Sequence, residues 1–285
     1  MSAEVWTWVM IAAVGHALWN AAARHVAGDG AVMWLSFALG TMVMIPPCIY
    51  MWWQSGPPIL TEMALLCLLA TGVLHAAYFA LLSWAYEDGD ISLVYPIARG
   101  SGVGLTALGG IILLGESVSL WGSAGIGLIL LGIGLISLPA LRSGLSQGHS
   151  LLPALSVGLS IVAYSLVDKV GVRLIHPLYY ITGMWIIGSL LRWPFIWIQH
   201  RGTLWATALT HYPHIAFIGL GSLGTYLLIL YAYTLGPVSY IVAARESSVV
   251  IGALIGFVFL GEKYTRLKLV GVLSIAAGLA LIKVG

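Results

Sequence analysis

The chain has 285 residues, of which 60% are hydrophobic and only 8% are charged, and its formal net charge is +2. Soluble domains carry about 25% charged residues, so this composition excludes a water-soluble globular fold. The few basic residues are scattered and form no basic patch, which excludes nucleic acid as a partner. Because the mean hydropathy of +1.00 is spread along the whole chain, the expected partner of all of it is the lipid bilayer.

Charged residues, glycines and prolines divide the chain into apolar segments of the length that a membrane-spanning helix needs, about 20 residues. The sequence predicts ten such helices, over residues 5–23, 31–53, 62–85, 91–113, 119–139, 152–170, 177–198, 213–234, 238–260 and 267–283. The longest polar stretch between them, residues 142–150, predicts a linker between two domains, residues 1–145 and 146–285. The predicted fold class is all-α and integral to the membrane.

The two halves of the sequence carry similar short motifs in the same order. A Trp-Ala-Tyr stretch at 84–86 corresponds to Tyr-Ala-Tyr at 231–233, and Leu-Gly-Glu at 114–116 recurs at 260–262. Each half has five predicted spans, an odd number, so the second half must cross the membrane in the opposite direction to the first. The sequence therefore predicts two inverted five-helix repeats, with a solute site near the midplane between them.

The first and third predicted spans each carry a histidine with aromatic or polar neighbours. His16 and Asn20 are four residues apart and share one face of the first span, with Trp19 adjoining, and His75 shares a face of the third span with Tyr78. These side chains are candidates for lining the solute path. For both histidines the alternative is a hydrogen-bonded position in the core.

Two arginines occupy equivalent places in the repeats. Arg99 lies in the fourth span on one face with Tyr95, and Arg245 lies in the ninth span on one face with Ser248. A charge within a span costs about 2.5–3.5 kcal/mol on insertion scales, so each arginine is a candidate functional residue. Inversion should bring Arg99 and Arg245 to a common cavity, where two guanidinium groups would bind a carboxylate, phosphonate or sulfonate. The alternative is a structural role in ion pairs with nearby acids or bonds to backbone carbonyls.

Glu246 follows Arg245 directly and points about 100° away around the helix. A carboxylate in a poorly solvated cavity can bind and release a proton, which makes Glu246 the candidate for proton coupling. The alternative is a fixed salt bridge of Glu246 to Arg99 or Arg245. Asp168 and Lys169, near the end of the sixth span, are expected at the membrane interface.

Aromatic residues of the sixth and eighth spans could add to the site. Tyr164 and Tyr226 offer hydroxyls or an aromatic wall, although core packing explains them equally well. Arg192, near the end of the seventh span, is expected to extend its charge to the membrane interface.

The sequence shows no catalytic constellation, metal-ligand cluster or cofactor motif. The two cysteines, Cys48 and Cys67, lie in apolar runs and are expected to pack as small hydrophobic residues. The expected protein is not an enzyme and holds no metal or cofactor.

Three motifs together resemble the drug/metabolite transporter superfamily, in its EamA-type ten-helix branch. They are the paired Leu-Gly-Glu ends at 114–116 and 260–262, the Tyr-Pro-Ile-Ala-Arg stretch at 95–99, and the His-Ala-Leu-Trp-Asn stretch at 16–20. The resemblance covers nearly the whole chain and implies a carrier of amino acids, metabolites or drugs, with a cavity lined mainly by helices 1, 3, 4, 6, 8 and 9. The stretch that ends at Arg99 also resembles a branch associated with phosphonate use.

The sequence as a whole predicts a secondary active transporter of a small polar metabolite, an amino acid or organic anion, that works by alternating access, with proton coupling left open. The alternatives are an exporter of cationic or aromatic drugs and a non-transporting membrane scaffold or receptor. The expected location is a cell membrane, such as a bacterial inner membrane, and the expected state is a monomer or homodimer.

Loops after odd-numbered spans carry six basic residues against three on the opposite side. The positive-inside rule would place them in the cytoplasm; the family implies the reverse, so the orientation stays open.

Overall fold

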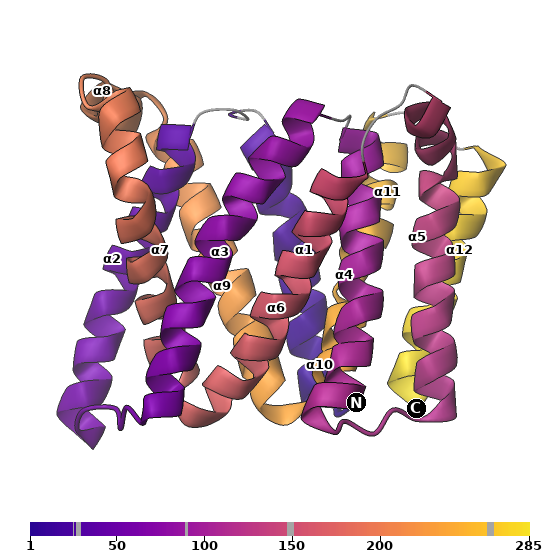
Figure 1. The fold of residues 1–285 in the computed structure, drawn as a ribbon, viewed down its shortest axis with the longest axis horizontal. Helices are drawn as coiled ribbons and strands as arrows, with labels where there is room; N and C mark the ends of the chain where they lie inside the picture. The colour runs from indigo at the N-terminus through magenta and orange to yellow at the C-terminus, as the bar shows by residue number, and fades with distance from the viewer. Residues whose placement is uncertain (25, 27–29, 89–90, 147–150, 261–264) are drawn as a thin grey trace.

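A computed structural model describes the chain except for residues 25, 27–29, 89–90, 147–150 and 261–264, and except for the side chains of some helical residues, Tyr95 among them. Within the described residues all regular structure is helical, and the long helices run side by side in one bundle (Figure 1). The helices are α1 (Ala3–Arg24), α2 (Gly30–Ser55), α3 (Glu62–Asp88), α4 (Ile91–Leu114), α5 (Leu120–Ser146), α6 (Leu152–Leu174), α7 (Pro177–His200), α8 (Leu204–Thr210), α9 (Tyr212–Leu235), α10 (Val238–Ala244), α11 (Ser247–Leu260) and α12 (Arg266–Val284).

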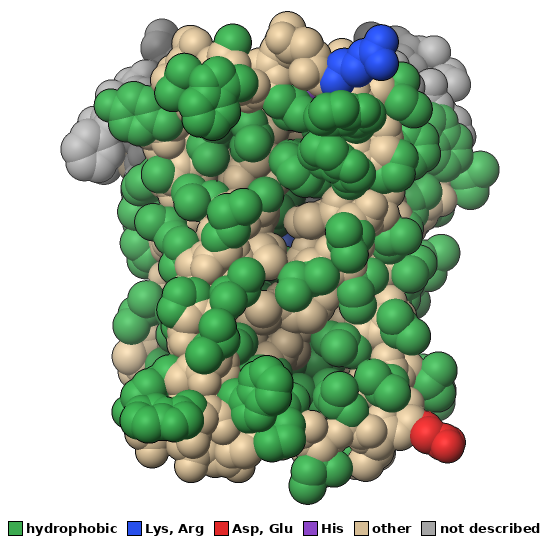
Figure 2. All heavy atoms as spheres, turned by 90° about the vertical axis from the view of Figure 1, so that its left-hand side faces the viewer, with side chains coloured by type: hydrophobic (Ala, Val, Ile, Leu, Met, Phe, Trp, Pro, Cys, Tyr) green, Lys and Arg blue, Asp and Glu red, His purple; other side chains and the backbone are tan. Residues whose placement is uncertain are grey.

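Eight of the described helices, α2 to α7, α9 and α12, are long and apolar enough to cross a membrane. Hydrophobic side chains predominate on the face that Figure 2 shows, and the charged side chains on its surface lie at the two ends. This is the pattern of a lipid-facing surface, because apolar side chains meet the acyl chains and charges reach the water. The prediction of a multi-pass α-helical membrane protein is confirmed, and the predicted count of ten is consistent with these eight spans.

Two local predictions need correction. The ninth predicted span, residues 238–260, is not one helix, because it breaks at Arg245 and Glu246 between α10 and α11. The short helix α8 falls where the sequence predicts only a connection. Hydropathy averages over many residues, so it detects neither a break inside an apolar run nor a single helical turn outside one.

The contacts between helices are preserved when each helix is replaced by its counterpart in the other repeat. Helices α1, α2 and α3 of the first repeat correspond to α6, α7 and α9 of the second. Helix α3 packs against α6, and correspondingly α9 packs against α1. Likewise α2 packs against α9, and α7 packs against α3. The last helix of each repeat, α5 and α12, pack against each other. The two repeats are therefore interleaved, and neither buries its central surface without the other.

Glycines let α5 and α12 meet backbone to backbone. A Cβ atom on Gly125 would lie 2.6 Å from the carbonyl oxygen of Gly278, and one on Gly132 would lie 2.5 Å from the carbonyl oxygen of Gly271. Non-bonded atoms do not approach so closely, so any added side chain would force the two helices apart. Small residues at such contacts stabilise helix pairs in membranes through close packing.

We expect Gly132→Ala to lower the Tm of the purified protein by several degrees. Overpacking costs about 1–3 kcal/mol, and each kcal/mol shifts Tm by roughly 2–4 °C. The matched control is Gly134→Ala in the same helix, where an added Cβ would meet nothing within 4 Å. This change should leave Tm unchanged or raise it slightly, because alanine favours the helix. Equal shifts in the two variants would contradict the close contact.

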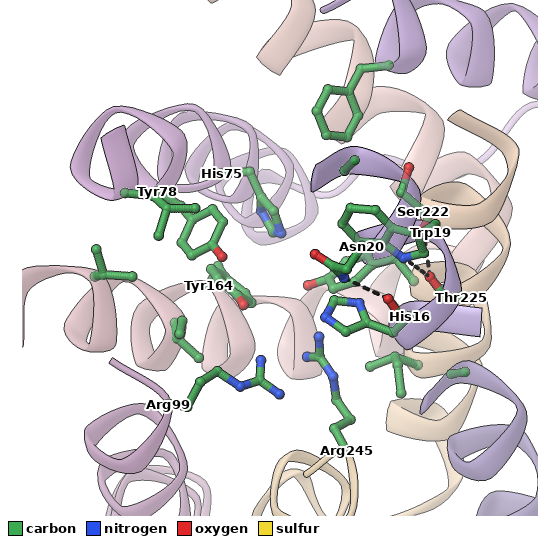
Figure 3. Close-up of a pocket in the computed structure, with 18 of the residues that line it drawn as sticks. His16, Trp19, Asn20, His75, Tyr78, Arg99, Tyr164, Ser222, Thr225 and Arg245 are labelled. Atoms are coloured by element: carbon green, nitrogen blue, oxygen red, sulfur yellow. Dashed lines mark hydrogen bonds between the residues drawn. The ribbon is translucent and has the colours of Figure 1, made fainter. Parts of the chain in front are cut away.

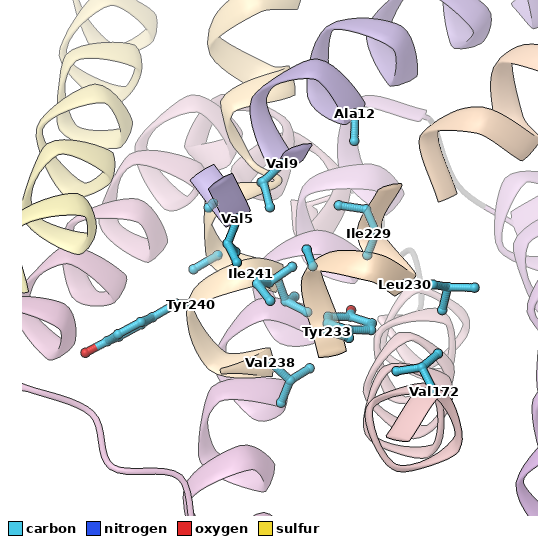
Figure 4. Packing of buried hydrophobic residues seen from close by; sticks show 14 of the residues in the cluster. Val5, Val9, Ala12, Val172, Ile229, Leu230, Tyr233, Val238, Tyr240 and Ile241 are labelled. Carbon is cyan, nitrogen blue, oxygen red and sulfur yellow. The ribbon is translucent and has the colours of Figure 1, made fainter. Parts of the chain in front are cut away.

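Apolar packing fills the end of the bundle that holds both termini, here called the closed end (Figure 1). Val5 and Val9 of α1 are buried in one cluster with Ile229 and Leu230 of α9 and with Ile241 of α10 (Figure 4). These residues come from both repeats, so the cluster joins the two halves. The closed end therefore leaves no open path along the axis of the bundle between these helices.

The Leu-Gly-Glu motif at 114–116 also joins the halves at the closed end. Gly115 has a φ of 65°, which glycine adopts without strain, and it turns the chain after α4. The Glu116 carboxylate then accepts hydrogen bonds from the backbone N–H groups of Val238 (2.7 Å) and Ser239 (3.1 Å) and from the Ser239 hydroxyl (2.5 Å). Free N–H groups at a helix N-terminus favour a carboxylate, which explains why glutamate follows glycine in this motif.

Candidate functional site

A cavity of about 230 Å³ lies between the two repeats, on the side of the closed end that faces away from the termini. Its walls come from α1, α3, α4, α6, α9 and the break between α10 and α11, which are the six spans that the family resemblance implies. Two further helices contribute, α2 through Phe37 and α7 through Trp185. The cavity is thus central to the bundle and shared by the repeats.

Most of the residues that the sequence singles out lie around this one cavity, and Figure 3 shows how they face it. They are His16, Trp19, Asn20, His75, Tyr78, Arg99, Tyr164, Tyr226 and Arg245. Ser248 is buried in α11 and Glu246 is buried beside Arg99; neither is part of the lining. The side chain of Tyr95 lies outside the described residues.

The lining also includes polar and aromatic side chains that were not predicted, among them Phe37, Trp185, Ser222 and Thr225. Ser222, Thr225 and Tyr226 follow one another at helical spacing in α9, so a search for polar faces in the eighth span would have found them. Phe37 and Trp185 carry no such signal. Aromatic side chains in apolar helices are equally expected in the core or facing lipid.

Arg99 and Arg245 point into the same cavity from opposite repeats (Figure 3). Arg99 forms an ion pair with Glu246, with 2.5 Å between Nη2 and Oε1 and 3.3 Å between Nε and Oε2. The pair is bidentate and almost fully buried, with side-chain exposures of 12% and 1%. The structure therefore contains the salt bridge that the sequence left open as the alternative role of Glu246.

Arg245 differs from Arg99, because it has no carboxylate partner among the described residues. Its guanidinium lies over the Tyr226 ring, 5.8 Å from the ring centroid, within the range of a cation–π contact. The backbone around it is tightened: the N–H of Glu246 bonds to the carbonyl of Ala243 (3.1 Å) and that of Ser248 to Arg245 (3.1 Å). Such i to i+3 bonds inside a helix often mark a functional hinge.

The expectation that Asp168 lies at the membrane interface is wrong. Its side chain is 0% exposed, and three hydroxyl groups donate to it: Thr71 at 2.5 Å, Tyr180 at 2.9 Å and Tyr226 at short range. These donors come from α3, α7 and α9. A hydropathy profile registers the charge in α6 but cannot register partners that arrive from three other helices.

Lys169 also departs from its predicted interfacial position. Lys169 is 2% exposed, and its Nζ donates to the carbonyls of Tyr233 and Gly236 at the end of α9, at 2.5 Å each. Arg192 is half-buried in α7 and lines a smaller side pocket with Trp34. Lysine can remain charged in such a place because carbonyl oxygens replace its water.

Aromatic and histidine side chains form a further part of the cavity wall. The His75 ring lies 4.4 Å from the Tyr164 ring and 5.3 Å from the Tyr226 ring, measured between centroids. Trp19 packs edge-to-face on His16 and donates from Nε1 to the Thr225 hydroxyl at 3.3 Å, which links α1 to α9. The cavity therefore combines two guanidinium groups with flat rings, and one of these rings, that of Tyr226, lies against Arg245.

This arrangement suits a small organic anion with an apolar part. Guanidinium groups bind carboxylate, phosphonate or sulfonate oxygens through directed hydrogen bonds, and rings offer apolar surface with hydroxyl groups at their edges. In the part of the chain that the structure describes, no three side chains of His, Cys, Asp or Glu come together to hold a metal ion.

No curated protein matches the chain. A crystal structure of a protein 14% identical to this chain superposes with a TM-score of 0.71 over 98% of this chain and 95% of the other, which shows a shared fold. The EamA-like transporter family matches residues 5–138 and again residues 149–284. The chain therefore belongs to the EamA-like transporter family, within the drug/metabolite transporter superfamily, and is a multi-pass membrane transporter.

Proposed function

We propose that the protein is a secondary active transporter of a small organic anion, an amino acid or related molecule with a carboxylate, phosphonate or sulfonate group. The observation that carries this proposal is Arg245, a guanidinium in the cavity wall without a carboxylate partner among the described residues. A charge within the membrane is costly unless something neutralises it. An anionic solute would offset that cost each time it binds.

The charges of the site favour one anionic group per solute. Glu246 neutralises Arg99, so Arg245 is a lining guanidinium without a carboxylate partner among the described residues. The cavity volume of about 230 Å³ lies below the roughly 300–1,000 Å³ typical of pockets for drug-sized ligands. Charge and size together favour an amino-acid-sized anion over a large drug.

In this proposal each lining residue has a role. Arg245 and Arg99 bind the anionic group, with Arg99 held in place by Glu246. The rest of the solute would be enclosed by His16, Trp19, Asn20, His75, Tyr78, Tyr164 and Tyr226. Ser248, which is buried in α11, would support Arg245 from behind.

Alternating access is supported by the unequal ends of the bundle. The cluster around Val9 and Ile241 fills the closed end, while the cavity occupies the other part. Two inverted repeats can exchange these arrangements, so that the packed end opens and the other end closes. The break at Arg245 would let α10 and α11 tilt separately during that exchange.

The cavity lies toward the loops that follow odd-numbered spans, which carry most of the basic residues. The burial of Lys169 removes one of the three basic residues counted for the opposite side. By the positive-inside rule the cavity of this state would then face the cytoplasm of a cell with this protein in its plasma or inner membrane.

An exporter of cationic or aromatic compounds is the second candidate, favoured by the rings that line the cavity. Rings attract organic cations through cation–π contacts, but the Arg245 guanidinium, which has no carboxylate partner among the described residues, would repel them. A non-transporting scaffold or receptor, the third reading, predicts no solute flux.

A thermal-shift screen of the purified protein tests these readings. The panel is L-glutamate, L-phenylalanine, taurine, 2-aminoethylphosphonate and tetraethylammonium, followed by flux of any stabilising compound into proteoliposomes. We expect an anionic compound to raise Tm, since a ligand at 100 times its Kd stabilises the folded state by about 2.7 kcal/mol. Stabilisation by tetraethylammonium alone would favour the cation exporter, and stabilisation without flux would favour the receptor.

A further inference from the structure

Asp168 is a second buried acid, and its surroundings differ from those of Glu246. No lysine or arginine among the described residues lies within ion-pair distance of it, and its three partners are hydroxyl groups. It follows Tyr164, a cavity-lining residue, by four positions on the same face of α6, in the direction of the closed end. Asp168 therefore lies beneath the cavity, between the solute site and the closed end.

A chain of hydrogen bonds leads from the cavity to this acid. His75 lines the cavity, and its Nδ1 lies 3.0 Å from the carbonyl oxygen of Thr71 and 3.1 Å from the Thr71 hydroxyl. A carbonyl oxygen only accepts, so Nδ1 carries the hydrogen. The Thr71 hydroxyl in turn donates to Oδ1 of Asp168 at 2.5 Å. The Nδ1 hydrogen of His75 is thus directed at Thr71, and the Thr71 hydroxyl hydrogen is directed at Asp168.

Tyr226 connects the same acid to the proposed anion site. Its hydroxyl donates to Oδ2 of Asp168, while its ring lies beneath the Arg245 guanidinium. The hydroxyl has a single hydrogen to donate. Hydrogen bonds to an ionised acceptor are roughly twice as strong as those to a neutral one, so the charged form of Asp168 competes with any solute for that hydrogen.

We propose that Asp168 is the proton-binding residue of the transport cycle, loaded from the cavity through His75 and Thr71, and that its loading releases the Tyr226 hydrogen for the anionic solute at Arg245. The solute half of this proposal rests on the proposed function. Proton and anion would then bind cooperatively and cross together, with no change in the total charge of the site.

The proton steps balance. Nε2 of His75 takes a proton from the cavity, and Nδ1 passes its own proton to the hydroxyl oxygen of Thr71. The Thr71 hydroxyl then passes its original hydrogen to Oδ1 of Asp168. The imidazole ends neutral with its hydrogen on Nε2, and Asp168 ends as a neutral acid. Reversal of the same steps, once the cavity has opened to the other side of the membrane, returns the hydrogen to Nδ1 of His75 and restores the starting state.

Other charged and titratable groups surround Asp168 on every packed element. They are Cys67 and His75 of α3, Tyr164 and Lys169 of α6, Tyr180 of α7, Tyr226 and Tyr233 of α9, Arg245 at the helix break and Arg99 of α4. Of the cations, Lys169 binds carbonyls and Arg99 binds Glu246. The groups that bind Asp168 are therefore the hydroxyls of Thr71, Tyr180 and Tyr226.

Infrared difference spectra recorded on acidification of the purified, unliganded full-length protein test the proton site directly. The carbonyl stretch of a newly protonated acid should be present in the wild type and in Glu246→Gln, and the component due to Asp168 should be missing in Asp168→Asn. A spectrum unchanged by Asp168→Asn, or one that loses the same band in Glu246→Gln, would overturn the assignment.

Thr71 variants test the route, because Thr71→Val removes the hydroxyl that links His75 to Asp168 and Thr71→Ser keeps it. After a rapid drop in pH the band should develop at least about tenfold more slowly in Thr71→Val, which corresponds to the loss of one hydrogen bond of about 1.4 kcal/mol. Thr71→Ser, which keeps the hydroxyl, should restore the rate. Equal rates in the two variants would exclude Thr71 as the relay.

Two tyrosines form a matched pair for the coupling to solute. Tyr226→Phe and Tyr180→Phe each remove one donor to Asp168, so each should raise the pH at which the band develops by about one unit. Only Tyr226 lines the cavity, so only Tyr226→Phe should also reduce the Tm shift produced by the anions of the panel. Equal anion responses in the two variants would refute the coupling. If no anion binds the wild type, the proposed function fails, while the infrared spectra still decide on Asp168.

Discussion

Replacement of Arg245 by alanine is expected to abolish most of the anion affinity of the protein while leaving its fold intact. Truncation of one partner in a buried, hydrogen-bonded charge pair costs about 2–5 kcal/mol, which corresponds to a loss of roughly 30-fold to several thousand-fold in Kd. Because Arg245 has no carboxylate partner among the described residues, its removal leaves no acid unpaired. The measurement is the Kd of the stabilising anion, obtained by titration of intrinsic tryptophan fluorescence, together with Tm.

Two controls show whether the effect of Arg245→Ala belongs to the site. Arg245→Lys keeps the charge but loses the planar fork, so it should retain part of the affinity. Arg192→Gln changes another arginine of the transmembrane region, which lines the side pocket rather than the central cavity, and it should bind the anion as the wild type does. Similar losses in Arg245→Ala and Arg192→Gln would mean that a general effect of charge is being measured.

The largest effect on stability is expected for Glu246→Gln. Removal of one partner of a buried ion pair costs about 3–5 kcal/mol, because it leaves the other charge uncompensated. At roughly 2–4 °C per kcal/mol, Tm should fall by on the order of 10 °C. The uncompensated charge would be that of Arg99, whose side chain is 12% exposed.

A double-mutant cycle separates this ion pair from simple loss of packing. Arg99→Gln alone should destabilise the protein about as much as Glu246→Gln, and the double variant should recover much of the loss, since it leaves no charge unpaired. Tm values measured in one detergent provide the comparison. Fully additive losses in the double variant would show that the two side chains do not stabilise each other.

The unequal roles of the two arginines follow from one difference between the repeats. Arg99 is followed by Gly100 and Arg245 is followed by Glu246, so only the second repeat supplies an acid at this place. That acid reaches across the interface and neutralises the arginine of the first repeat. The first repeat has Gly100 at this place, and Arg245 has no carboxylate partner among the described residues.

The helices themselves could be predicted from the sequence because the bilayer leaves little choice. A backbone that crosses it must satisfy its own hydrogen bonds, so apolar length alone indicates helices. The predicted spans 62–85 and 177–198 become α3 (Glu62–Asp88) and α7 (Pro177–His200), with ends that differ by three residues or fewer. The repeat motifs then indicated inversion, and inversion indicated that Arg99 and Arg245 meet.

Pairing, by contrast, was decided only by the tertiary structure. The sequence could not distinguish an acid bound by arginine, as Glu246 is, from an acid bound by hydroxyl groups, as Asp168 is. It also placed Lys169 at the interface, although carbonyls at the end of α9 hold it inside. Hydropathy and helical spacing are properties of one segment at a time, and they determined the spans, the repeat and the candidate residues. The partner of a buried charge comes from another helix, so it is determined only when the helices pack.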